Sequence, residues 1–170
     1  MDEVSLLIDL ITSKWSANAT ALADAGKISS SHTVTPQVLD IRNTTANKGV
    51  RVDLSRSPAT IVVFEDSQNI DYPTVHYDIR NEVYSFTMHI RVLHDERSGL
   101  DANYGKDRLR AIYLILSRVI ESNRTGYTAS DGSKFTQLFL GSRRESNDRA
   151  KRLFGYKVNL EAKRHAVTLP

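Results

Sequence analysis

The sequence contains no cysteine among its 170 residues. Disulfide bonds, thiolate metal sites and cysteine nucleophiles are therefore excluded. The chain also lacks any run that approaches the ~18 consecutive apolar residues of a transmembrane helix. Its opening residues, Met-Asp-Glu, lack the basic start of a secretory signal peptide. We therefore expect no contact with a membrane and no metal held through sulfur.

Common catalytic motifs are missing as well. The eight glycines are scattered and form neither a phosphate loop nor a dinucleotide fingerprint, and there is no Gly-x-Ser-x-Gly elbow. The five histidines do not pair at helical metal spacing, and His89 and His94, five apart on a predicted strand, would lie on opposite faces. We therefore expect no catalytic residue, no metal and no cofactor, and a protein that is not an enzyme.

The clearest positive signal is a period-two alternation at 83–93. Tyr, Phe, Met, Ile and Val occupy one parity from 84 to 92, which predicts a long strand with one buried face and favours an antiparallel sheet. The opposite parity carries the polar residues that we expect at a subunit interface, namely Ser85, Thr87, His89 and Arg91. The alternation at 153–163 repeats this pattern and predicts a partner strand.

Two amphipathic helices are predicted at 4–15 and 109–120, because apolar residues recur there at offsets of three, four and seven. The segment 16–36 is rich in Ala, Ser, Thr and Asn and predicts a long N-terminal loop, with a short helical piece at 19–25 that Gly26 would end. Long loops in small domains are typical of binding segments.

The remaining segments predict further strands and turns. Strands are expected at the residues that follow Pro36, and at 59–64, 74–80 and 135–140. Irregular segments are expected at 65–69, 94–104 and 141–149, and a hairpin or a bulge at 81–82, with the hairpin favoured. Ordinary composition and the absence of a convincing boundary predict one domain, 1–170, with an α+β fold: two helices packed on one face of a mainly antiparallel sheet.

Positive charge is concentrated near the end of the chain. Residues 143–164 carry eight basic and three acidic side chains, whereas the whole chain has a net charge of only +3. An anionic partner, either nucleic acid or an acidic protein face, would explain this pattern, and so would a solvated strand face. The candidate DNA or partner contacts are the basic residues around the predicted turn, namely Arg143, Arg144, Arg149, Lys151 and Arg152.

One constellation fits an enzyme. Glu161 and Lys163 share a face of the last predicted strand, and Asp148 precedes them. This is the acid-and-lysine arrangement of PD-(D/E)xK metal-dependent nucleases. Alternating charge on a wet strand face explains the same pair, and the chain after Lys163 is too short for the helix that packs behind the nuclease motif.

Several local strings stand in a characteristic order. The first helix ends in Trp15-Ser16-Ala17-Asn18, and 35–38 (Thr-Pro-Gln-Val) follow a polar gap. The strand 61–65 (Ile-Val-Val-Phe-Glu), the long strand 84–92, the helix 109–120 and the alternating strand 154–162 complete the order. In this layout the chain resembles tail terminator and tail-completion (head-tail joining) proteins of tailed bacteriophages and related archaeal viruses, over nearly its whole length.

The resemblance implies a structural virion protein of the neck, assembled in the host cytoplasm. Such proteins form a homo-oligomeric ring, commonly a hexamer, that caps the tail tube, ends its polymerisation and joins it to the head connector. The partners implied are other copies of the chain, the tail tube protein, the head-side neck protein, and genomic DNA that passes through the lumen without sequence-specific contacts. Another neck component, an adaptor or a stopper, is the alternative within this class.

Overall fold

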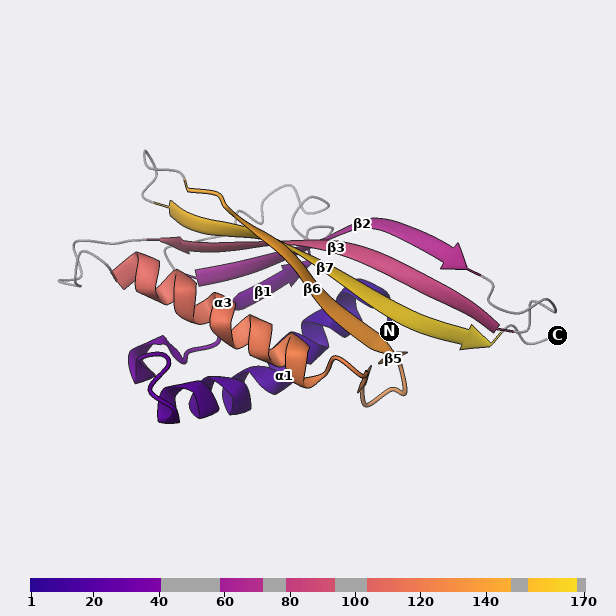
Figure 1. Cartoon of the computed structure of the whole chain (residues 1–170), viewed down its shortest axis with the longest axis horizontal. Helices are drawn as coiled ribbons and strands as arrows, with labels where there is room; N and C mark the ends of the chain where they lie inside the picture. Colours follow the sequence, from indigo (N-terminus) through magenta and orange to yellow (C-terminus); the bar gives the residue numbers. More distant parts are fainter. Residues whose placement is uncertain (41–58, 72–78, 94–103, 148–152, 168–170) are drawn as a thin grey trace.

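The architecture is a five-stranded sheet with two helices on one face (Figure 1). It comes from a computed structural model that describes residues 1–40, 59–71, 79–93, 104–147 and 153–167. The sheet order is β1-β2-β3-β7-β6, with β1 parallel to β2 and every other pair antiparallel. The strands are β1 (Gln37–Asp40), β2 (Ala59–Asp71), β3 (Ile79–Leu93), β6 (Gln137–Glu145) and β7 (Leu153–Val167). The predicted α+β fold is confirmed.

The central strand is β3, as the alternation predicts. It pairs with β2 on one side and along its whole length with β7 on the other. Its alternate side chains from Tyr84 to Val92 are at most 2% exposed and face the helices. Trp15, Phe86 and Phe135 are the largest side chains that are fully buried in this core. Two short strands, β4 (Tyr127–Thr128) and β5 (Lys134–Phe135), form a separate hairpin beside the main sheet.

Helix α1 (Glu3–Asp24) is longer than the predicted helix at 4–15. The loop predicted over 16–36 is wrong at 16–18, and the short helical piece predicted at 19–25 is the last part of this same helix. Asp2 caps its start by accepting a 2.8 Å hydrogen bond from the amide of Ser5. The helix continues because Ala has the highest helix propensity and because Ala19 and Leu22 extend the buried stripe. Gly26, with φ of +66°, follows the helix end in the left-handed conformation expected for it.

The connection from α1 to β1 is held by side chains. It includes a short 3-10 helix, η1 (Ser30–His32). Arg108 donates hydrogen bonds to the carbonyls of His32 and Val34, and the indole of Trp15 donates to the carbonyl of Thr33 at 3.1 Å. Three consecutive carbonyls, at the end of η1 and directly after it, thus accept side-chain hydrogen bonds, which fixes the path of this connection.

Helix α3 (Tyr104–Ser122) covers the sheet beside α1. Its predicted apolar stripe is buried as expected, apart from Tyr113, which is half-buried. Arg108, which lies off that stripe in the sequence pattern, is only 6% exposed, because its guanidinium reaches the carbonyls of the α1–β1 connection. Of the irregular segment predicted at 94–104, residues 94–103 lie outside the described residues, and Tyr104 begins α3.

β3 and β2 both extend further than the pattern predicts. β3 runs without interruption through 81–82, so the favoured hairpin there is wrong, and 74–78 lie outside the described residues. β2 continues through the predicted loop at 65–69, with a bulge between Glu65 and Ser67. These polar residues form a strand because backbone pairing with β3, a contact distant in sequence, outweighs their weak strand propensity.

The sheet is longer than the helical layer that covers it. In Figure 1 the far ends of β2, β3 and β7 project beyond both helices, on the side of the C-terminus. Residues 65–70 of β2 are all exposed, and Ile70 is 48% exposed. A strand without cover on either face has no buried parity, which explains its mixed polar sequence.

Candidate functional site

The face of the sheet opposite the helices carries an open groove of about 530 Å³. It crosses four strands, β2, β3, β7 and β6. Six of its ten lining residues are polar or charged, and Phe139 contributes an aromatic wall. The principal lining side chains are Asp66, Ser85, Phe139, Asn159, Glu161 and Lys163.

Polar side chains are linked across this face. The hydroxyl of Thr87 on β3 donates to a carboxylate oxygen of Asp66 on β2, and it lies 3.4 Å from the amide oxygen of Asn159 on β7. The amide nitrogen of Asn159 in turn donates to Ser142 on β6 at 3.3 Å. These contacts join four strands side to side and hold the face rigid, as a surface for other molecules requires.

The four residues predicted as a subunit interface have different environments. Thr87 is only 4% exposed, Ser85 and His89 are half-buried, and Arg91 is exposed. The ring of His89 lies 4.7 Å from that of Phe64. Burial lowers the pKa of His89, as do the nearby charges of Arg91 and Lys157, so the imidazole is neutral at pH 7. All four are on the strand and parity that the sequence predicts, and their role in an interface stays a prediction.

The predicted basic turn at 141–149 is wrong for its first part. β6 continues to Glu145 after a bulge between Leu140 and Arg143, so Arg143 and Arg144 lie on an edge strand. Antiparallel pairing with Lys157 and Tyr156 on β7 holds this extension in place. The other three basic candidates, Arg149, Lys151 and Arg152, lie outside the described residues.

Arg143 and Arg144 point to opposite faces of the sheet. Arg143 is on the helix side, and its guanidinium lies 4.4 Å from the ring centre of Tyr113 and 4.7 Å from that of Tyr156. Arg144 stands opposite Lys157 on the other face, and both are exposed. The environments of the two arginines therefore differ: Arg143 is held by cation–π contacts, whereas Arg144 presents its charge to solvent.

Other basic side chains also rest on half-buried aromatic rings. The ammonium of Lys106 is 5.9 Å from the ring centre of Phe154, and Lys163 and Arg124 both lie over the ring of Phe139 at 5.6 and 5.4 Å. The sequence patterns identified none of these contacts. No spacing signal could find them, because each pair joins two elements distant in sequence.

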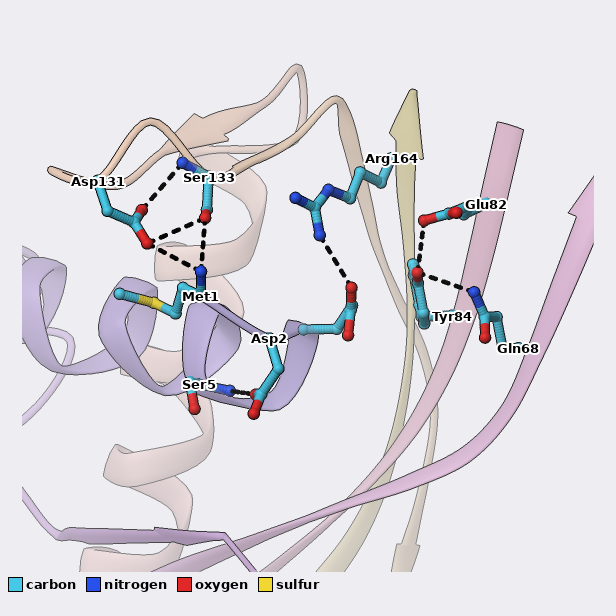
Figure 2. A network of polar contacts seen from close by, with 10 residues as sticks. Met1, Asp2, Ser5, Gln68, Glu82, Tyr84, Asp131, Ser133 and Arg164 are labelled. Atoms are coloured by element: carbon cyan, nitrogen blue, oxygen red, sulfur yellow. Dashed lines mark hydrogen bonds and ion pairs between the residues drawn. The ribbon is translucent and has the colours of Figure 1, made fainter. Parts of the chain in front are cut away.

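A polar network surrounds the start of α1 (Figure 2). The N-terminal amine is 2.9 Å from a carboxylate oxygen of Asp131 and donates to Ser133 at 3.0 Å. The hydrogen bond from the N-terminal amine to Asp131, followed in size by the one from the Ser133 amide, lowers the pKa of Asp131 to about 2. Arg164 on β7 also reaches this helix start, since its guanidinium is 2.9 Å from Glu3. The network attaches α1 to both sheets.

A second part of this network lies on the strands. Tyr84 donates a 2.5 Å hydrogen bond to the buried carboxylate of Glu82 and accepts one from Gln68 at 3.0 Å (Figure 2). Burial, followed by the bond to Glu82, raises the pKa of the Tyr84 hydroxyl above its ordinary value. Tyr84 therefore remains a neutral donor at any physiological pH, and its hydrogen bond from Gln68 links β3 to β2.

The acid-and-lysine pair considered for a nuclease does share one face. Glu161 and Lys163 both line the groove, and Lys163 also lies over Phe139. Asp148 is outside the described residues. Within the described residues no group of three or more His, Asp or Glu side chains is arranged to hold a metal ion.

Comparison with known proteins leaves the family resemblance as a prediction. No protein-family model matches the chain, and no curated protein gives a significant match. Among the helices of the described residues, none is long and apolar enough to cross a membrane.

Proposed function

We propose that this chain is a structural protein of a viral neck, a tail-terminator-like subunit that closes into a ring on the end of a tail tube. The observation that carries the proposal is the sheet itself, whose long strands project beyond the helices and whose faces are crossed by side-chain hydrogen bonds. A ring protein needs a stiff element that reaches a neighbour, and it needs no reaction centre. The order of elements that resembles tail terminators supports the same function.

The basic residues fit the passage of DNA through such a ring. Arg144 and Lys157 form an exposed basic pair on the face away from the helices. Contacts from such residues to phosphates are independent of base sequence and weaken as salt rises. Replacement of Arg144 and Lys157 by alanine is expected to reduce DNA retention at low salt and to flatten its salt dependence. Replacement of two exposed arginines on α3, Arg110 and Arg118, by alanine removes the same charge from another surface and is the control.

A tube-growth assay tests the main proposal. The purified chain is added to polymerising tail tube protein of the same virus, and tube lengths are measured by electron microscopy. Shorter tubes, each with one capped end, are the expected result. A chain that remains monomeric and leaves tube length unchanged contradicts the proposal. Rings that leave the tube unchanged but bind the head-side connector would identify a stopper or an adaptor instead.

A further inference from the structure

Arg143 is held in a corner formed by two tyrosine rings. Its guanidinium lies 4.4 Å from the ring centre of Tyr113 on α3 and 4.7 Å from that of Tyr156 on β7, and the planes of the two rings stand at 76° to each other. Aromatic faces hold a guanidinium by cation–π attraction and leave its N–H edge for an acceptor. Arg143 is exposed, and none of the described residues accepts a hydrogen bond from it. The side chain is thus positioned in advance to bind an oxyanion of another molecule.

The bulge in β6 places Arg143 on this side of the sheet. Leu140 faces the helices, and strict alternation from it would put Arg143 on the opposite face, the one that carries the groove. The register shift between Leu140 and Arg143 adds one residue, so Arg143 comes level with the fully buried Val158 and turns toward the tyrosines. Bulges re-aim side chains in this way. The irregularity of β6 therefore gives the chain a fixed cation on its helix side.

The groove on the other face of the sheet supplies a matching acceptor. Glu161 lines it, is exposed, and forms no hydrogen bond or ion pair with the described residues. The lining also holds the carboxylate of Asp66, which accepts from Thr87, and the ammonium of Lys163, which lies over Phe139. Two carboxylates and one ammonium give the groove a net negative charge. An arginine that enters the groove can pair with Glu161, and a bidentate arginine–carboxylate pair is among the stronger charged contacts.

The two sites lie on opposite faces of the sheet. Arg143 is on the face that the helices cover (Figure 1), and the groove opens on the other, so Arg143 cannot enter the groove of its own chain. One copy can offer Arg143 to the groove of the next while its own groove receives a third copy. Such contacts join two different surfaces, and repetition with a closing rotation produces a ring. Arg144 and Lys157 share the face of the groove, so insertion of either would join that face to itself and close a two-fold pair.

We propose that the groove binds Arg143 of a second copy of this chain, with Glu161 as the carboxylate that pairs with its guanidinium. The inference rests on the proposed function, because it names a subunit contact of the proposed ring. The contact includes Ser85, which the sequence predicts at a subunit interface and which lines the groove. Charged pairs at an interface select the partner surface, because like charges at the same place oppose association.

Reversed charges test the pairing, because each copy carries both surfaces. Arg143→Glu protein has an acidic group at both surfaces and Glu161→Arg protein has a basic group at both, so neither variant is expected to assemble well alone. In an equimolar mixture each variant offers what the other lacks. Arg143 then meets Glu161 in one contact, and the introduced glutamate meets the introduced arginine in the next. Sedimentation velocity over a range of protein concentrations measures the size of the assemblies.

Each single variant is expected to need about a tenfold higher concentration than the unmodified protein to assemble, and the mixture should return to within about threefold of it. Arg144→Glu is the matched control, since it makes the same change of charge at the neighbouring residue, which lies on the opposite face, and it should also stay within about threefold. Circular dichroism checks the fold of each variant. Because Glu161 is exposed, Glu161→Arg tests the contact even where Arg143→Glu loosens the stack on the tyrosines.

Several results would overturn the contact. Assembly of either single variant at the concentration of the unmodified protein is one, and a mixture that assembles no better than its components is another. An unmodified chain that stays monomeric at every concentration also refutes it. Loss of assembly in Arg144→Glu that a mixture with Glu161→Arg restores would replace the contact by face-to-face pairs. Reduced DNA retention by Arg143→Glu with unchanged assembly would replace it by a phosphate contact.

Tail tubes separate the failure of this contact from the failure of the proposed function. The same variants and their mixture are added to tubes, and the tube ends are viewed by electron microscopy. Rings that respond to the charge reversals as expected but never attach to tube ends contradict the proposed function alone. Rings that cap tubes and are unaffected by the reversals contradict only the contact between Arg143 and Glu161.

Discussion

The connection between α1 and β1 depends on Arg108, and its replacement by methionine is the most informative test of the fold. Arg108 is 6% exposed, and its guanidinium donates to the carbonyls of His32 and Val34. Methionine fills a similar volume without donors, so both carbonyls lose a buried partner. Trp15 would continue to bind the carbonyl of Thr33 between them.

The magnitude follows from two charge-assisted hydrogen bonds. Each contributes about 1.5–3 kcal/mol net, and part of this is offset because burial disfavours the charged guanidinium, whose pKa is lowered by desolvation. We expect Arg108→Met to reduce the free energy of unfolding by about 3 kcal/mol. For a chain of this length that corresponds to a melting temperature lower by about 6–12 °C.

Urea unfolding monitored by Trp15 fluorescence measures the change, since this is the chain's one tryptophan. Arg118→Met, on an exposed position of the same helix, is the control and is expected to stay within about 0.5 kcal/mol of the unmodified protein. Hydrogen exchange should also accelerate selectively at 30–34. Equal stability of the two variants, or unchanged exchange in this segment, would refute the account of the connection.

Three further predictions concern β7, the helix start and the strand ends. Gly155→Ala should reduce the free energy of unfolding by about 1–3 kcal/mol, because a Cβ there would lie 2.6 Å from the carbonyl oxygen of Ser146. A reduction no larger than that caused by Gly141→Ala in the same denaturation assay contradicts this. Asp131 has a folded pKa of about 2, so it contributes stability that is present above its unfolded pKa of about 3.9 and is lost as pH falls towards 2. The difference in stability between the unmodified protein and Asp131→Asn should therefore shrink over that range. A difference that grows as pH falls would show the opposite linkage. Tyr84→Phe removes the bonds to Glu82 and Gln68 and should cost about 1–2 kcal/mol in thermal denaturation, whereas an unchanged melting temperature would show that these bonds add nothing.

Periodicity predicts the parts of the fold that depend on one buried face. The alternation around Met88 identifies the central strand and its inward side chains, and the stripe around Ile112 identifies the covering helix. Both elements have one dry face, so the pattern in the sequence and the burial in the structure have the same cause.

The misassigned segments lack that one-sided burial. The far part of β2 has no covered face, so its residues from Glu65 to Ile70 carry no alternation and resemble a loop. The end of α1 is small and polar apart from Leu22, and packing of a few residues is enough to continue the helix. The buried hydrogen bonds of Arg108 and the stacking of Arg143 on Tyr113 were missed because the partners come from other elements, and no local pattern records such contacts.

The central claim is that the chain forms a ring at the end of a tail tube, and negative-stain electron microscopy of the purified protein mixed with tubes of the same virus tests it most directly. The proposal predicts ring-shaped particles of several 19.1 kDa chains, six if the resemblance to tail terminators holds, attached to one end of each tube. Tubes with bare ends beside a protein that remains monomeric would contradict it.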